Sequence, residues 1–250
     1  MSAILFGMLH GWSVASPWSG NAVWWWQLVA MVWLVGKILR SESPKAAFKT
    51  AAWFSLAWFC SSMWWLYISM HNYGSLPAPL AALGVVALSA LLGSFYAIAV
   101  LVFATLKSEN TSKPFQDSLL FSALWLLAEL LRGSVMTGLP WSAAGYAHID
   151  GPLASAAPSI GVYGISALAA FIAALFSLTR SCMLKIGIAL LLCVKASLMT
   201  GTQAIPDKAS QTPSSAGLTV RLLQGNIPQN EKFDAKTGVV TALADRKSVV

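Results

Sequence analysis

Long stretches that are almost free of charged residues constrain this chain more than any other feature. Six predominantly apolar runs span residues 22–39, 51–70, 79–106, 118–131, 153–179 and 183–199. Most of them approach the roughly 20 residues that a helix needs to cross a hydrocarbon core of about 30 Å. A shorter stretch, 3–18, is interrupted by His10 and Gly11 and predicts a weaker span or a re-entrant helix. We therefore expect an all-α polytopic membrane helix bundle of about seven transmembrane helices over residues 1–200.

The overall composition supports a membrane protein. Of the 250 residues, 57% are hydrophobic and only 10% are charged, whereas a soluble domain carries about 25% charged residues. Such a chain cannot cover a water-facing surface. The net charge of +7 comes from 16 basic residues, which are spread over alternate connections instead of forming one patch. This spread argues against a nucleic-acid-binding protein.

The basic residues also predict the orientation of the helices. They gather in alternate connections, at Lys37, Arg40, Lys45, Lys49, Lys107, Lys113, Arg180 and Lys185. The intervening connections, 71–78 and 133–152, contain no lysine or arginine. Because cytoplasmic connections are enriched in basic residues, we expect the N-terminus in the cytoplasm and the residues after 201 outside. No basic residue precedes Lys37, so a secretory signal peptide is not predicted.

The composition changes after residue 200. Residues 201–217 form a polar linker rich in proline, serine and threonine. Residues 218–224 are rich in strand formers and predict a β-strand, which the turn 225–229 leaves. One strand and one partial helix cannot bury a core. Residues 218–250 are therefore interpreted as the start of a larger, incomplete α/β domain.

Two ionisable residues lie in the apolar run 118–131 and just after it. Glu129 and Arg132 are three positions apart, so they share one side of a helix. Ionisable groups inside a membrane helix are costly and suggest a functional role. Two interpretations stay open. Arg132 snorkels to the interface with Glu129 as its partner, or it contacts a phospholipid head group or fixes the following loop.

That loop, residues 133–152, is dense in glycine, proline and aromatic residues. Trp141 and Tyr146 are interpreted either as anchors at the membrane interface or as residues that line a lipid entrance. Gly138, Pro140 and Gly145 are predicted to shape the turns of the loop, because glycine permits positive φ and proline restricts φ.

No other residue pattern predicts a catalytic or metal site. Cys60, Cys182 and Cys193 lie inside apolar runs without metal-ligand spacing, and they are interpreted as small hydrophobic residues. His71 ends an apolar run, and His148 and Asp150 lack the spacing of a metal site or a catalytic triad. We expect no metal, no cofactor and no catalytic cysteine in these 250 residues.

Several segments resemble the apolipoprotein N-acyltransferase family and occur in the family's order. The most specific are Thr137-Gly-Leu-Pro-Trp141 and Leu223-Gln-Gly-Asn-Ile-Pro-Gln-Asn-Glu-Lys-Phe-Asp234, with further matches at 64–74, 125–133 and 158–164. The resemblance implies a bundle of membrane helices in the bacterial inner membrane that carries a periplasmic nitrilase-like domain. It also implies transfer of an acyl chain from a phospholipid, through a cysteine thioester, to the N-terminal amine of a diacylglyceryl-cysteine lipoprotein.

The resemblance places the Glu-Lys-Cys triad of the nitrilase-like domain beyond residue 250. Glu231 and Lys232 belong to the tail of the matching motif and are not the triad. We therefore expect residues 1–250 to hold the lipid-handling part and to be inactive alone. Two alternatives stay open: a related nitrilase-like membrane acyltransferase with another acceptor, and a non-catalytic membrane module for lipid binding or transport.

Overall fold

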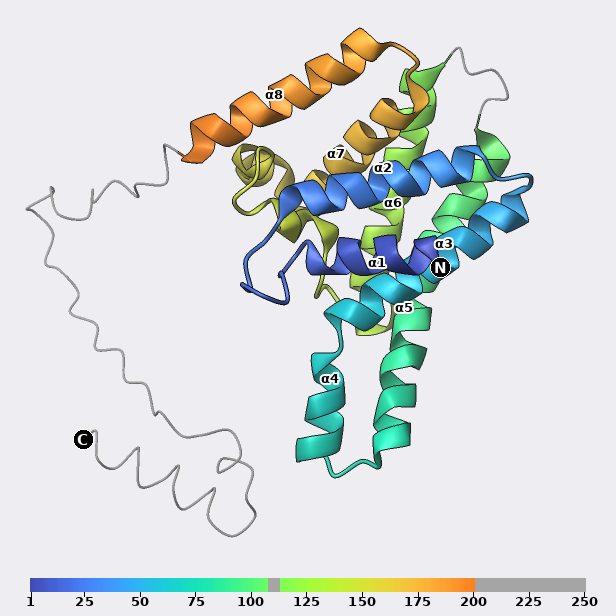
Figure 1. Ribbon diagram of the computed structural model, residues 1–250. Coiled ribbons are helices and arrows are strands. Elements are labelled where there is room, and N and C mark those ends of the chain that lie inside the picture. Colours follow the sequence, from blue (N-terminus) through green and yellow to red (C-terminus); the bar gives the residue numbers. More distant parts are fainter. Residues whose placement is uncertain (108–112, 201–250) are drawn as a thin grey trace, which may run out of the picture.

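The computed structural model describes residues 1–107 and 113–200, which form helices and connecting turns without a β-strand (Figure 1). This confirms the predicted all-α class for the described part of the chain. The principal helices are α1 (Ser2–Trp12), α2 (Trp24–Leu39), α3 (Pro44–Ser62), α5 (Ala78–Leu106), α6 (Pro114–Ser134), α7 (Ala157–Leu178) and α8 (Cys182–Thr200). The predicted linker 201–217 and the predicted domain 218–250 lie outside the described residues.

Proline and serine mark the starts of several helices. A proline occupies the first turn of α3, α5, α6 and α7, where its missing N–H and restricted φ cost nothing. Ser43 caps α3, and its side-chain oxygen accepts a hydrogen bond of 3.2 Å from the backbone N–H of Ala46. These local signals explain why helices begin directly after the polar connections.

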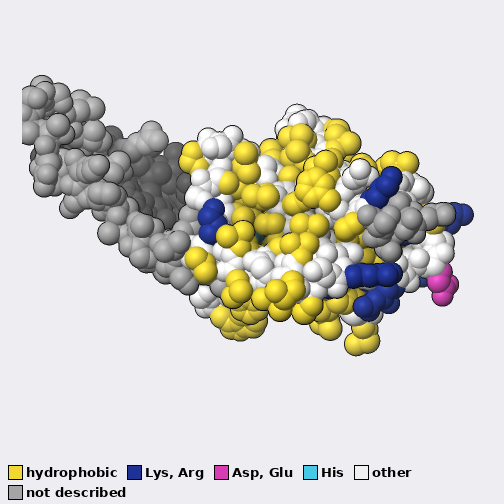
Figure 2. All heavy atoms as spheres, turned by 90° about the horizontal axis from the view of Figure 1, so that it is seen from above, with side chains coloured by type: hydrophobic (Ala, Val, Ile, Leu, Met, Phe, Trp, Pro, Cys, Tyr) yellow, Lys and Arg dark blue, Asp and Glu magenta, His cyan; other side chains and the backbone are white. Residues whose placement is uncertain are grey.

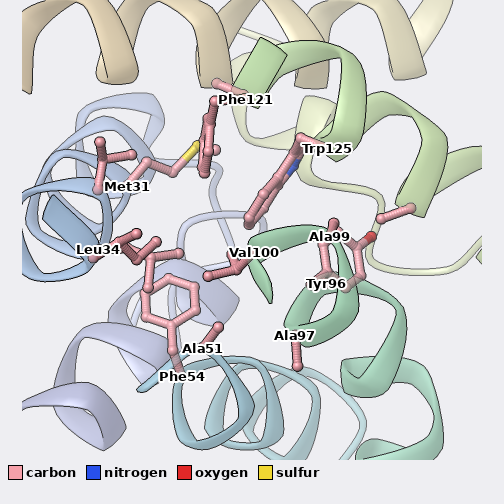
Figure 3. Close-up of a cluster of buried hydrophobic side chains, with 14 of the residues drawn as sticks. Met31, Leu34, Ala51, Phe54, Tyr96, Ala97, Ala99, Val100, Phe121 and Trp125 are labelled. Carbon is pink, nitrogen blue, oxygen red and sulfur yellow. The ribbon is translucent and has the colours of Figure 1, made fainter. Parts of the chain in front are cut away.

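The core of the bundle is aromatic and lies between α2, α3, α5 and α6. Figure 3 shows Met31 and Leu34 from α2 meeting Phe54 from α3, with Tyr96 from α5 and Trp125 from α6 nearby. The indole of Trp58 on α3 is fully buried and stacks parallel to Trp125 at 6.0 Å between ring centroids. Both indoles also contact the ring of Tyr96 on α5. The hydroxyl of Tyr96 belongs to the polar residues of the candidate site.

Small residues bring neighbouring helices into backbone contact. A Cβ on Gly7 of α1 would collide with the carbonyl oxygen of Phe54, and one on Gly11 with Ser61 and Trp58 of α3. On the other side of α3, the hydroxyl of Ser55 donates to the carbonyl of Gly93 on α5 at 3.0 Å. Membrane helices commonly pack through small residues in this way, because close approach strengthens van der Waals contact.

The apolar run 51–70 does not form a single helix, so the predicted continuous span is wrong there. Helix α3 ends at Ser62, and a short helix α4 (Trp65–Ile68) continues into a π-helical turn, η1 (Ser69–Tyr73). Apolar periodicity alone cannot report such a change of direction. The segment and the start of α5 extend together away from the bundle (Figure 1).

Two of the described helical segments, Ala78–Leu106 and Ala154–Leu178, are long and apolar enough to cross a membrane, with mean hydropathies of 2.4 and 2.0. The second contains a kink at Gly161, whose φ is +65°. The predicted total of about seven spans stays a prediction.

The basic connections share one end of the bundle. The turn from α2 to α3, the start of α6 and the turn from α7 to α8 all lie toward the right of Figure 1, whereas the residues between α6 and α7 lie toward the left. Figure 2 shows most of the visible lysine and arginine side chains gathered at the same end. The alternation of basic and uncharged connections along the chain is therefore also a separation in space.

Candidate functional site

Glu129 and Arg132 form a buried ion pair on the last turns of α6. Arg132 Nη2 lies 2.7 Å from Glu129 Oε2, and the side chains of both residues have no exposed surface. The predicted positioning on one side of the helix is confirmed. Because Arg132 is enclosed by protein, the interpretation that it snorkels to the interface is wrong.

The other nitrogens of Arg132 bind the loop that follows α6 and a residue of α5. Nη1 donates to the carbonyl oxygens of Leu139 and of Trp141, the latter at 3.0 Å. Nε donates to the hydroxyl of Tyr96 on α5 at 3.0 Å. The guanidinium thus connects its own helix, a neighbouring helix and the loop. Its bonding supports a loop-fixing role over direct contact with a lipid head group.

Glu129 holds a second point of the same loop. Its Oε1 accepts a hydrogen bond of 3.1 Å from the backbone N–H of Ala144. In the opposite direction, the N–H of Leu139 donates to the carbonyl oxygen of Arg132 at 3.1 Å. The ion pair therefore fixes the segment 139–144 at both ends. A buried charged pair is stable only when its remaining donors and acceptors are satisfied, and the loop backbone provides those partners.

A second polar branch fixes the loop from α2. The side-chain amide of Gln27 donates to the carbonyl oxygen of Ala144 at 2.5 Å. Its oxygen lies 2.6 Å from Nε2 of His148 in the 3₁₀-helix η3 (Ala144–His148). Because a backbone carbonyl only accepts, the amide nitrogen must face Ala144, and the amide oxygen must face His148. Nε2 of His148 therefore carries a proton and donates it to Gln27.

Burial lowers the pKa of His148 from 6.5 to about 4. The side chain is inaccessible to solvent, and desolvation disfavours its charged form. Sequence reasoning excluded His148 from metal and triad chemistry but missed its structural role with Gln27. A glutamine inside the apolar run 22–39 was the available signal, because a buried amide requires partners. Tyr96 and Ser166, in two other runs, carried the same signal.

Of the predicted turn residues, Gly138 has the positive φ for which glycine is needed, whereas Gly145 does not. Gly138 has φ +75° and ψ 150°, a region that only glycine adopts readily. A Cβ there would also collide with the carbonyl group of Gly133. Gly145 lies within η3 (Ala144–His148), where the close carbonyl of Val162 leaves no room for a side chain, and its N–H donates to the hydroxyl of Ser166 at 2.7 Å. Pro140 lies exposed between Leu139 and Trp141.

The two aromatic candidates are exposed. Trp141 and Tyr146 have 55% and 42% of their surface accessible. The ring of Trp141 packs edge-on against Trp65 of α4, with 5.3 Å between the centroids. Thr137 and Ser142, on either side of Trp141, have positive φ values of 72° and 60°. Such backbone conformations persist only where surrounding bonds impose them, and the bonds to Arg132 and Glu129 do so here.

The described residues contain no group of three or more histidine, cysteine or acidic side chains that could hold a metal ion. Cys60 is partly exposed and Cys182 is exposed, and neither forms a disulfide bond. The hydrogen bonds of the polar residues at the end of α6 organise the loop that follows it.

Comparison with known proteins identifies the family of this chain. The sequence profile described as the apolipoprotein N-acyltransferase N-terminal domain matches residues 3–175. The chain belongs to the apolipoprotein N-acyltransferase family. The match includes α6, the loop and most of α7, so the Arg132 network lies wholly within the family's N-terminal domain.

Curated relatives agree with the profile. An apolipoprotein N-acyltransferase of Verminephrobacter eiseniae is 42% identical, covering 96% of this chain and 47% of the relative. That of Ralstonia nicotianae is 38% identical over 97% of this chain and 45% of its own length. That of Pseudomonas putida is 37% identical over 78% and 39%. The chain thus spans about half the length, or less, of the curated relatives it matches.

Proposed function

We propose that this chain is the membrane part of an apolipoprotein N-acyltransferase, which transfers an acyl chain from a phospholipid to the N-terminal amine of a diacylglyceryl-cysteine lipoprotein. Family membership and the names of the relatives support this activity. A nitrilase-like domain with a Glu-Lys-Cys triad would supply the nucleophile, and a thioester would divide the transfer into two easier steps.

The proposed location is the bacterial inner membrane, crossed several times, with the N-terminus in the cytoplasm and the residues after 201 in the periplasm. The gathering of the basic connections at one end of the bundle supports this orientation. The loop with Trp141 then lies on the periplasmic side, where both lipid substrates are presented.

One observation supports a specific role for the loop. Arg132 binds the carbonyl of Trp141 from inside the bundle, while the indole of Trp141 stands exposed beside Trp65. The loop therefore presents a fixed aromatic surface. We propose that Trp141 and Tyr146 line the lipid entrance and that Glu129 and Arg132 are positioning residues, acting through the loop backbone. An indole suits an entrance because it combines apolar area with one polar group.

The test uses a chimera that joins residues 1–217 to the remaining part of the Verminephrobacter eiseniae relative. N-acylation of a diacylglyceryl lipopeptide is measured with phospholipid as donor. Trp141→Ala is expected to raise KM for the phospholipid, whereas Trp25→Ala, an exposed indole on α2, is the matched control. Equal activity of both variants would contradict the entrance role. An inactive parent chimera that is correctly folded would contradict the proposed activity.

Residues 1–250 alone are expected to be inactive, since the resemblance places the triad beyond them. Incubation with a radiolabelled phospholipid tests this expectation. Formation of a hydroxylamine-sensitive thioester on the 250-residue chain would overturn it. The same chimera distinguishes the two alternatives: an acceptor other than the lipopeptide would indicate a related acyltransferase, and lipid binding without any transfer would indicate a non-catalytic module.

A further inference from the structure

A wholly apolar groove lies between α2, α7 and α8, away from the Arg132 network. Its volume is about 450 Å³, and every lining side chain is apolar. The lining includes Val29 and Val32 from α2, Phe176 from α7, and Ile188 and Leu192 from α8. Nothing in such a groove can bind water through hydrogen bonds, so a hydrocarbon occupant is favoured over solvent.

One edge of the groove carries a cation. Lys185 precedes Ile188 by three positions and Leu192 by seven, so the three residues share one face of α8. The Nζ atom of Lys185 lies 5.3 Å from the ring centroid of Phe176, a lining residue. Arg180, exposed in the turn before α8, lies at the same end of the helix.

Neither cation has an acidic partner among the residues that the structure describes. The ion pair within the described part of the chain joins two other residues, Glu129 and Arg132. The other end of α8 is tied to the bundle differently, by a hydrogen bond of 3.4 Å from Lys195 to the hydroxyl of Ser155. The groove therefore has an apolar interior and one unneutralised basic end, which is the charge pattern complementary to an anionic amphiphile.

We propose that this groove binds one acyl chain of an anionic phospholipid, whose phosphate is held by Lys185 and Arg180. The distance along α8 from Lys185 to Leu192 is about 10 Å at 1.5 Å per residue, enough to seat the part of the chain nearest the glycerol. The remaining length extends into the surrounding bilayer. Lysine and arginine near a membrane surface attract anionic lipids, and the apolar walls add burial of methylene groups.

The bound lipid is distinct from the lipid substrate of the proposed reaction. The turn from α7 to α8, next to Lys185, lies at the end of the bundle that carries the basic connections, whereas the connection between α6 and α7, which contains Trp141, lies toward the opposite end (Figure 1). Its role is to join α8 to α2 and α7. This inference does not depend on acyl transfer, and a failed activity assay would leave it intact.

The test measures lipid binding by the purified chain in a mild detergent with native mass spectrometry. Phosphatidylglycerol and phosphatidylethanolamine with identical acyl chains are titrated separately, and inorganic phosphate is added as a competitor. We expect preferential binding of phosphatidylglycerol. Lys185→Gln should weaken this binding about fivefold and weaken that of phosphatidylethanolamine less, because the ammonium group of that lipid already offsets the charge of its phosphate. Lys45→Gln, an exposed basic residue in the first turn of α3, is the matched control.

Two substitutions on α8 test the apolar part of the site. Ala189 lines the groove and is exposed, so Ala189→Phe fills the groove without disturbing the core. It should reduce the binding of both lipids, whereas Leu191→Phe, at an exposed position outside the lining, should reduce neither. Thermal unfolding of each variant, followed by circular dichroism, checks that the helices remain folded.

Three results would overturn the proposal. Equal affinity of the wild-type chain for the two lipids would remove the role of the cations. Full displacement of phosphatidylglycerol by inorganic phosphate, with no effect of Ala189→Phe, would indicate a phosphate site without an acyl groove. A dimer that Ala189→Phe dissociates, with lipid content unchanged, would show that a second copy occupies the groove.

Discussion

The side-chain oxygen of Gln27 on α2 lies 2.6 Å from Nε2 of His148, although 121 positions separate the two residues. The same amide binds the carbonyl of Ala144, and the N–H of Ala144 donates to Glu129. The aromatic loop is therefore fixed by two buried polar branches that reach it from different helices. Each branch can be broken separately, which makes the contribution of each one measurable.

The His148 branch predicts a pH dependence of stability. The pKa of His148 is lowered to about 4 in the folded chain and returns to about 6.5 on unfolding. The unfolded state therefore binds the proton first as the pH falls. The stabilisation is complete above about pH 6.5 and is lost between that value and pH 4, by about 3 kcal/mol in total.

Thermal unfolding in detergent at pH 7 and pH 5 tests this prediction. His148→Gln, which keeps a donor toward Gln27 but does not titrate, should reduce the difference in Tm between the two pH values. His71→Gln, whose parent ring contacts the carbonyl of Leu76, is the control and should retain most of the difference. An unchanged pH response in His148→Gln would show that the imidazole is not responsible.

Because Glu129 and Arg132 form a buried ion pair, the losses in unfolding free energy from substituting each residue should not add. Arg132→Met leaves the Glu129 carboxylate buried without its cation and should destabilise the chain by about 3–5 kcal/mol. The double variant Glu129→Gln/Arg132→Met removes that uncompensated charge and should be less destabilised. Denaturant unfolding in detergent measures Arg132→Met, Glu129→Gln and the double variant. If the double variant lost as much as the sum of the two single variants, the pair would not be coupled.

Gly138 predicts a stability loss from a single methyl group. Gly138→Ala forces a non-glycine residue into φ +75°, ψ 150° and toward the carbonyl of Gly133, at a cost of about 1–3 kcal/mol or more. Gly36→Ala is a matched control, because nothing lies near its added Cβ within α2. That control should be neutral or stabilising by up to about 1 kcal/mol. Equal midpoints for the two variants would show that the turn relaxes freely.

The proposed orientation predicts opposite accessibility for two connections. In a cysteine-free variant of the chain, a cysteine introduced by Lys45→Cys should be protected from a membrane-impermeant maleimide in intact cells with a permeabilised outer membrane. A cysteine introduced by Asp150→Cys should react. Permeabilising the inner membrane should expose the first site. Labelling of both sites before that step would contradict the orientation.

Helix positions bounded by charges and prolines followed closely from the sequence. The runs 22–39, 79–106 and 183–199 became α2, α5 and α8 with ends shifted by at most two residues. The run 51–70 did not, because α3 ends at Ser62 and the chain changes direction before Trp65. An apolar stretch carries no local signal for that change, since every residue in it suits a buried helix.

The residues of the candidate site were also only partly predictable from the sequence. Glu129 and Arg132 could be paired from their spacing, because positions three apart on a helix are neighbours whatever surrounds them. The glycines of the loop were recognisable from residue type. Gln27, Tyr96 and Ser166 were not recognised, since their partners lie on other segments. Whether Arg132 faced lipid, solvent or the loop also depended on how α5 and α6 pack.

The amino-acid sequence by itself determined the apolar helices, their alternating basic connections and the local pairing within α6, because these depend on hydrophobic burial and on the 3.6-residue repeat. Only the tertiary structure decided that Arg132 binds Trp141, that Gln27 binds His148 and that Lys185 borders an apolar groove. Those relationships join residues from different elements, and the packing of large aromatic and small residues between helices sets their distances.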